Sequence, residues 1–301
     1  MITPPYLKKG SIIAVVATAR TANEQQIEQS KIILEKQGFH VVISSNVSHV
    51  HHRFAGEDEE RIRCFQSLLD DETIDAIWLA RGGYGTVRIL DSIDWTKFLK
   101  YPKWLIGFSD FTAVHLKLQQ LKVASIHACT FTQVQRFGVA NENIITVLEI
   151  LLNQKSNYTF AGSLENKPGT SEGNLVGGNL SLICNSMGTA TQLKTDDCIL
   201  MLEDCDEYLY HYDRMFSQLH RAGLLQNLKG LIIGKSTIKP EPEELYFGFS
   251  LEEIVLHYCE SFTYPICFNA PMGHTDKNYA FALNTNHVLA VEKNEVTITP
   301  Y

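Results

Sequence analysis

The first half of the chain alternates short apolar runs with longer amphipathic segments. The apolar runs, which predict strands, are 12–17, 41–43, 76–80 and 105–107. The segments with helical spacing are 23–37, 57–69 and 111–121, and Gly38 follows the first as a helix-stop signal. Because a βαβα rhythm produces parallel strands covered by helices, we expect an N-terminal, Rossmann-like parallel-sheet domain.

The pattern changes after residue 152. Residues 153–173 are polar and rich in turn-forming residues, which predicts a linker between domains. Further on, 199–202 and 230–234 have the pattern of strands, 213–222 and 251–261 that of helices, and 288–299 alternates as antiparallel strands do. We therefore expect an α/β protein with domains at 1–152 and 174–301, the second smaller and mixed α/β.

Charge and cysteine content limit the function classes. The net charge of −8 is spread along the chain without a basic block, which argues against nucleic-acid and anionic-membrane partners. Lys8-Lys9 and the apolar run after them resemble a signal peptide, but the run is short and β-branched, as in a buried strand. Seven scattered cysteines without a CxxC pair favour a reducing compartment, so we expect a cytoplasmic protein.

Ser109 stands where a predicted strand meets a predicted helix, in Gly107-Phe108-Ser109-Asp110. This is the position of a nucleophile elbow, whose sharp turn exposes the serine hydroxyl. The full G-x-S-x-G pattern is absent because Phe111 occupies its last position. A serine that caps the helix is the alternative.

A glycine-rich turn, Arg81-Gly82-Gly83-Tyr84-Gly85, follows the third predicted strand. Glycines let backbone N–H groups approach an anion closely, so the turn is an oxyanion-hole candidate. It has the spacing of neither a dinucleotide fingerprint nor a phosphate loop. A tight turn with only a structural role is the alternative.

Acidic residues and a histidine complete the candidate chemistry. Glu203, Asp204, Asp206 and Glu207 follow an apolar strand, and His274 follows a Pro/Gly turn. A carboxylate at a strand end can orient a catalytic histidine, whereas a solvated acidic loop and a surface histidine are the alternatives. Ser109, Glu203 and His274 occur in the order nucleophile, acid, base. Metal-ligand spacing is absent around the acidic group.

Taken together, these segments resemble the LD-carboxypeptidases (muramoyltetrapeptide carboxypeptidases) and the related microcin C immunity peptidases. The motifs that carry the resemblance are Lys9-Gly10, Phe54-Ala55-Gly56 with Glu59-Glu60-Arg61, residues 80–85 and 107–110, Gly177-Gly178-Asn179-Leu180, residues 202–207 with Asp213-Arg214, and Gly273-His274. Two departures are Ala17-Thr18-Ala19, where the family usually has Ala-Pro-Ser, and the segment after His274, which lacks the family's prolines.

The resemblance implies a serine carboxypeptidase with a Ser109–Glu203–His274 triad, with Glu207 as the rival acid. It further implies cleavage of the L,D-bond before the terminal D-alanine of murein tetrapeptides in cell-wall recycling, a homodimer, and neither metal nor cofactor. We expect the N–H groups of Asp110 and of Gly82 or Gly83 to hold the oxyanion. Arg81, Tyr84 and Arg214 are candidate substrate-binding residues. The alternatives are a hydrolase of aminoacyl or peptidyl sulfamoyl adenylates and a non-enzymatic small-ligand binder.

Overall fold

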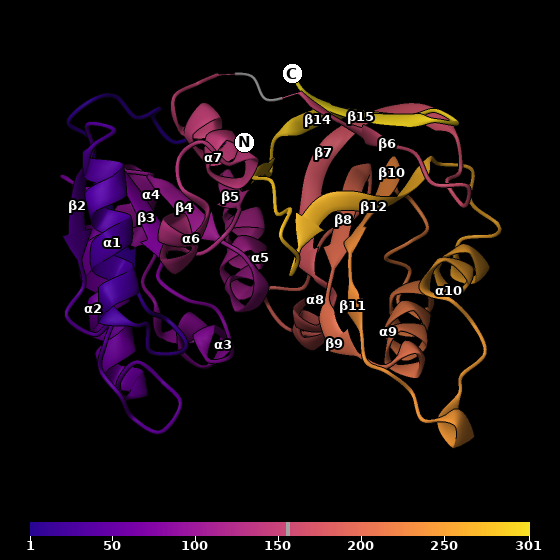
Figure 1. Cartoon of the computed structure of the whole chain (residues 1–301), viewed down its shortest axis with the longest axis horizontal. Coiled ribbons are helices and arrows are strands. Elements are labelled where there is room, and N and C mark those ends of the chain that lie inside the picture. Colours follow the sequence, from indigo (N-terminus) through magenta and orange to yellow (C-terminus); the bar gives the residue numbers. More distant parts are fainter. Residues whose placement is uncertain (155–156) are drawn as a thin grey trace. The chain divides into compact units, whose positions relative to one another are not determined.

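The computed structural model describes residues 1–154 and 157–301 of the chain. The chain divides into two compact units, one formed by Met1–Lys155 with Tyr279–Asn284 and the other by Ser156–Asn278 with Thr285–Tyr301. In Figure 1 each unit contains its own sheet with helices packed beside it. None of the helices among the described residues is long and apolar enough to cross a membrane.

The first unit is built on a six-stranded sheet. Its strands are β1 (Ile12–Val16), β2 (His40–Ile43), β3 (Ala76–Leu79), β4 (Trp104–Gly107), β5 (Ser125–His127) and β13 (Phe281–Leu283), in the order β13-β5-β4-β3-β1-β2. All neighbouring pairs from β2 to β5 are parallel, which confirms the predicted parallel sheet. The order 2-1-3-4-5 is that of a doubly wound fold, whose ligands bind beside β1 and β3.

Helices fill the connections between these strands. They are α1 (Glu24–Glu35), α2 (Asp58–Asp70), α3 (Thr86–Ile89), η1 (Leu90–Ser92), α4 (Thr96–Lys100), η2 (Ser109–Phe111), α5 (Thr112–Leu121), η3 (Phe131–Gln133), α6 (Val134–Phe137) and α7 (Glu142–Leu151). The Asn23 side chain accepts from the Gln26 N–H and so begins α1. The strands β3 and β4 are buried along their whole length, which accounts for their unbroken apolar runs.

The second unit has a seven-stranded mixed sheet in the order β12-β10-β8-β7-β14-β15-β6. Its strands are β6 (Tyr158–Ala161), β7 (Gly169–Asn179), β8 (Cys198–Glu203), β10 (Gly230–Lys235), β12 (Ile266–Gly273), β14 (Asn286–Val291) and β15 (Glu295–Pro300). The four strands β7, β8, β10 and β12 are parallel, whereas β14 and β15 pair antiparallel as predicted.

Among the residues that the structure describes, three helices and a small two-stranded sheet complete this unit. The helices are α8 (Leu180–Ser186), α9 (Leu209–Arg221) and α10 (Leu251–Tyr258), with the short turn η4 (Glu243–Leu245). The small sheet pairs β9 (Cys205–Glu207) with β11 (Thr237–Ile238). In Figure 1, α9 and α10 lie together on one side of the large sheet.

The segment 153–173 differs from the expected linker because it contains β6 and the first part of β7. β6 pairs with β15 and β7 with β14, both antiparallel. Alternate residues of β7 up to Glu172 are exposed, and the solvated face of an antiparallel strand is polar. Residues 155 and 156 lie outside the described residues. Residues 279–284, expected in the second domain, contain β13 and belong to the first unit.

Candidate active site

Ser109 lies at the carboxyl end of β4, in a backbone conformation that is unusual for a serine. Its φ angle is +61°, in the left-handed region that residues other than glycine rarely adopt. Ser109 is the first residue of η2, and Phe108 occupies the capping position of this short helix. A strained strand-to-helix turn with serine at its centre is the geometry of a nucleophile elbow.

His115 of α5 forms hydrogen bonds that hold the strand end before Ser109. Its Nε2 lies 2.9 Å from the Gly107 carbonyl oxygen and its Nδ1 2.8 Å from the Ser125 hydroxyl. A carbonyl only accepts, so Nε2–H donates to Gly107 and Nδ1 accepts from Ser125. Burial lowers the pKa of His115 to about 4, and the imidazole is therefore neutral at physiological pH. No sequence pattern singled out this residue.

The glycine-rich turn, residues 81–85, lies against Ser109. A Cβ added to Gly82 would come 3.4 Å from Ser109 Cβ and 3.5 Å from its Oγ. The buried Asp110 carboxylate accepts from the Gly85 and Thr86 N–H groups, at 3.2 and 2.8 Å. Among the described residues, the N–H groups of Gly82 and Gly83 donate to no protein acceptor. They are thus available to an oxyanion.

Arg61 ties this turn to the rest of the unit. Its guanidinium is fully buried and donates to the carbonyl oxygens of Thr18 and Gly85, the latter at 3.0 Å, and pairs with Asp58. In the sequence, Arg61 stands out only as part of the Glu59-Glu60-Arg61 motif. A signal was present, because Arg61 shares the buried stripe of α2 with Phe65, Leu68 and Leu69, where a charge is unexpected.

In the second unit, Glu203 and His274 form a pair. Glu203 ends β8 and His274 directly follows β12, and His274 Nδ1 lies 2.7 Å from Glu203 Oε2. The Glu203 side chain is completely buried. Gly273 has a φ of +114°, and a Cβ there would come 2.7 Å from the Lys235 carbonyl oxygen and 3.2 Å from Glu203. Glycine therefore lets His274 approach the carboxylate.

Electrostatics favour the charged form of this histidine. Burial alone would lower the pKa of His274, but the Cys205 side chain and the Glu203 carboxylate outweigh it and raise the pKa to about 10. The proximity of Cys205 was not expected from the sequence. A carboxylate that binds Nδ1–H fixes the imidazole orientation and leaves Nε2 for proton transfer.

The other acidic residues of this segment have different partners. Asp204 is buried and accepts from the Asn179 side chain at 2.9 Å and from the Ser181 N–H at 2.8 Å, at the start of α8. Burial, together with the Glu203 charge, raises the pKa of Asp204 to about 6. Glu207 pairs with His211 one helical turn away. Glu203, and not its rival Glu207, is the carboxylate that contacts His274.

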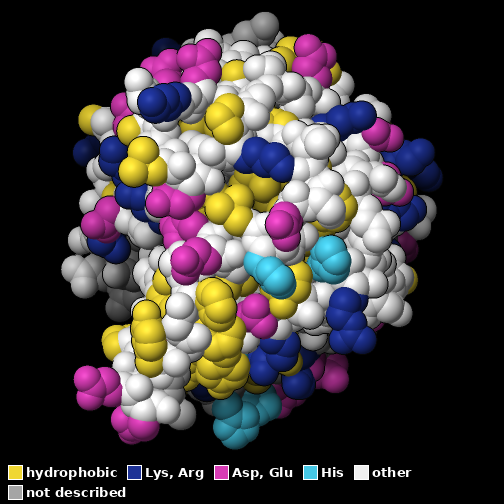
Figure 2. All heavy atoms as spheres, turned by 90° about the vertical axis from the view of Figure 1, so that its right-hand side faces the viewer, with side chains coloured by type: hydrophobic (Ala, Val, Ile, Leu, Met, Phe, Trp, Pro, Cys, Tyr) yellow, Lys and Arg dark blue, Asp and Glu magenta, His cyan; other side chains and the backbone are white. Residues whose placement is uncertain are grey.

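The three residues predicted to bind substrate are exposed. Arg81 Nη1 lies 3.4 Å from the Thr21 carbonyl oxygen, and the Tyr84 ring is 6.4 Å from that of Phe54. Arg214 belongs to α9, with its guanidinium 5.9 Å from the Tyr210 ring. Figure 2 shows hydrophobic side chains gathered on the lower part of one face of the molecule. Tyr210, Tyr246 and Phe249 are exposed aromatics of the second unit.

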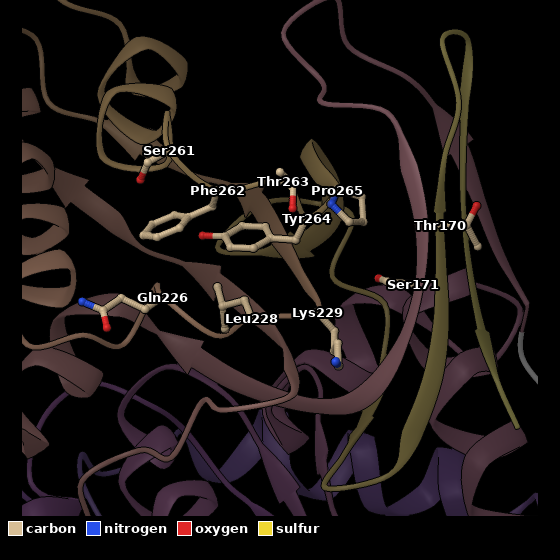
Figure 3. Close-up of a pocket in the computed structure, with 10 residues that line it drawn as sticks. All are labelled: Thr170, Ser171, Gln226, Leu228, Lys229, Ser261, Phe262, Thr263, Tyr264 and Pro265. Atoms are coloured by element: carbon tan, nitrogen blue, oxygen red, sulfur yellow. The ribbon is translucent and has the colours of Figure 1, made fainter.

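A pocket of about 410 Å³ opens elsewhere on the second unit (Figure 3). Lys229 and Pro265, which line it, directly precede β10 and β12, so it lies at the amino ends of these strands. Glu203 and His274 are at the carboxyl ends, which places them at the opposite edge of the sheet. Within the described residues, no three His, Cys, Asp or Glu side chains are grouped as metal ligands would be.

Two family models match the chain. The LD-carboxypeptidase N-terminal domain matches residues 13–128 and the LD-carboxypeptidase C-terminal domain matches residues 172–289. A probable murein peptide carboxypeptidase of Bacillus subtilis is 30% identical over 96% of this chain and 93% of its own length. A murein tetrapeptide carboxypeptidase of Pseudomonas aeruginosa is 26% identical over 92% of both chains.

Solved structures share the fold. A muramoyltetrapeptide carboxypeptidase from Oxalobacter formigenes superposes with a TM-score of 0.87 at 23% identity, over 96% of this chain and 98% of that one. An MccF-like protein from Bacillus anthracis gives 0.86 at 21% identity over the whole of both chains. At these identities the likeness shows the fold alone. The two family models and the relatives together show that this chain belongs to the LD-carboxypeptidase family.

Proposed function

We propose that this protein is a serine carboxypeptidase that removes the terminal D-alanine from murein tetrapeptides during cell-wall recycling. The observation that carries the proposal is the hydrogen bond between His274 and the buried Glu203 carboxylate, which gives the histidine the partner that a catalytic base requires. The strained backbone of Ser109 and the names of the relatives, which refer to murein peptides, support it.

In the first half of the reaction, Ser109 Oγ attacks the carbonyl carbon of the L,D-peptide bond while His274 Nε2 takes the hydroxyl proton. The oxyanion is held by the N–H of Asp110 and that of Gly82 or Gly83. When the C–N bond breaks, His274 returns the proton to the nitrogen of D-alanine, which leaves as the free amino acid. An ester between Ser109 and the tripeptide remains.

In the second half, water attacks the ester and gives a proton to His274, which passes it to Ser109 Oγ. The tripeptide leaves with a new carboxylate, so the net reaction adds one water to one peptide bond. Glu203 keeps its negative charge throughout and stabilises the imidazolium that forms in each half.

The test is hydrolysis of a purified tetrapeptide followed by mass spectrometry, with Ser109→Ala as the central variant. We expect the folded variant to release no measurable D-alanine. Labelling by a fluorophosphonate, which reacts with activated serines, should be lost at the same time. Substantial turnover by Ser109→Ala would overturn the assignment.

A second candidate substrate class is the aminoacyl or peptidyl sulfamoyl adenylates. A related fold has been solved as the microcin C7 self immunity protein MccF in complex with aspartyl sulfamoyl adenosine. Here Tyr208 and Tyr210 are stacked, with ring centroids 5.8 Å apart and planes at 13°, shortly after Glu203 in the chain. Such a pair can serve as a platform for a purine. Incubation with an aminoacyl sulfamoyl adenosine beside the tetrapeptide separates the two activities.

We also propose a cytoplasmic location and a homodimer. All seven cysteines are free, as expected in a reducing compartment. The homodimer rests on the family resemblance alone. Light scattering of the purified protein tests it, and a monomer mass at micromolar concentration would refute it.

A further inference from the structure

Arg20 follows β1 and lies against the glycine-rich turn, which also lies against the candidate nucleophile. In the sheet, β1 neighbours β3 and β3 neighbours β4. Arg20 comes shortly after β1, the glycine-rich turn after β3, and Ser109 after β4. The carboxyl ends of parallel strands meet at one edge, and the strand order reverses between β1 and β3. Ligands of doubly wound sheets bind at such a switch point.

The side chain of Arg20 crosses the glycine-rich turn. A Cβ added to Gly83 would come 2.6 Å from Arg20 Cδ and 2.8 Å from its Nε, closer than any real side chain tolerates. A Cβ added to the neighbouring Gly82 would come 3.5 Å from Ser109 Oγ. Arg20 therefore lies against Gly83, and Ser109 lies against Gly82, the residue before it.

Two more arginines surround Arg20. Arg53 precedes Phe54, and Phe54 forms an isolated antiparallel β-bridge with Arg20. The Arg81 guanidinium donates to the carbonyl oxygen of Thr21, the residue after Arg20. Burial and the charges of Arg53 and Arg81 lower the pKa of Arg20, while Asp110 opposes them. Asp110 already accepts from two N–H groups of the turn. Within the described residues, none of the three arginines forms an ion pair.

Three arginines gathered at the glycine-rich turn favour an anionic part of the substrate. A carboxypeptidase substrate ends in a carboxylate one residue beyond the scissile bond, and a guanidinium binds a carboxylate through two parallel hydrogen bonds. We propose that Arg20 binds the α-carboxylate of the residue that is released and thereby restricts cleavage to the last peptide bond. This inference rests on the proposed function and adds a residue that the sequence analysis did not select.

The experiment compares two tetrapeptides that differ only at the C-terminus, one with a free carboxylate and one with a primary amide. We expect the wild type to cleave the free acid at least 10-fold faster in kcat/KM. Arg20→Gln should lower kcat/KM for the acid by roughly 10- to 100-fold, mainly through KM, and leave the amide within about twofold. Discrimination between the two substrates would then disappear.

Arg63→Gln is the control, because Arg63 is exposed on α2 of the same unit. Labelling of Ser109 by an uncharged fluorophosphonate should proceed at the same rate in wild type and Arg20→Gln, which shows that the nucleophile is intact. Equal losses on acid and amide would overturn the role of Arg20, and so would a wild type that does not distinguish them. Either result leaves the function of Ser109 standing, because that function is tested by Ser109→Ala.

Discussion

The two units hold their candidate catalytic groups by different physical means. In the first unit, Ser109 depends on backbone geometry: a left-handed φ, glycines in the facing turn, and a neutral His115 that binds the preceding strand. In the second, His274 depends on charge, because the buried Glu203 carboxylate holds its Nδ1 and the Cys205 side chain and Glu203 together raise its pKa. The hydroxyl of a nucleophilic serine must be exposed and point at the substrate, whereas a general base needs a suitable pKa.

Loss of the Glu203 charge in the second unit should have the largest effect on kcat. Glu203→Gln keeps the side-chain volume but removes the charge that stabilises the imidazolium, and we expect kcat to fall on the order of 10⁴-fold. Glu207→Gln is the matched control, since it alters the other carboxylate–histidine pair of this segment, and it should change kcat less than about twofold. Steady-state hydrolysis of the tetrapeptide measures both. Similar losses in the two variants would contradict the comparison.

A change in backbone geometry in the first unit should come next. Gly83→Ala puts a side chain at a φ of +125°, which L-residues rarely adopt, and relief of this strain moves the N–H groups of the turn. We expect kcat to fall on the order of 10²-fold, as when one oxyanion donor is lost. The pKa of His274, followed by NMR, should stay the same, because it is set by Glu203 and Cys205. A pKa that moved with Gly83→Ala would show that the two units are not independent.

Arg61 tests how the turn is anchored. Arg61→Met leaves the carbonyl oxygens of Thr18 and Gly85 without this buried donor, so we expect the free energy of unfolding to drop by about 2–4 kcal/mol. Arg63→Met, on the exposed side of the same helix, should cost less than about 0.5 kcal/mol. Urea unfolding gives both values. Equal stability of the two variants would mean that Arg61 does not support the turn.

The pH dependence should give the smallest effect and the sharpest test of the second unit. A pKa of about 10 keeps His274 protonated at neutral pH, and a base must be neutral. We therefore expect kcat/KM to rise with pH up to the alkaline range, and Glu203→Gln to move the midpoint to lower pH. The ion pair stabilises the fold fully below pH 6.5 and loses this contribution as pH rises through about 10. A flat profile would contradict this account.

Much of the fold follows from local patterns. The runs at 76–80 and 105–107 predict β3 and β4 because both strands are buried along their length, so every position is apolar. The polar composition of 153–173 predicts a linker, but β6 and the first part of β7 form there because each has exposed positions that polar residues can fill. β13 is only three residues long, and its place beside β5 comes from long-range pairing.

The sequence by itself determined the family, the alternation of strands and helices, and the three residues proposed for catalysis, because each of these resides in short contiguous motifs. Tertiary structure decided which carboxylate contacts His274, since Glu203 and Glu207 are four residues apart and differ only in what the fold brings beside them. It also decided where Arg20, Arg61 and His115 lie and what they contact. The contacts of Arg20 with Gly83 and of Arg61 with Gly85 join segments distant in the chain, which only the folded structure brings together.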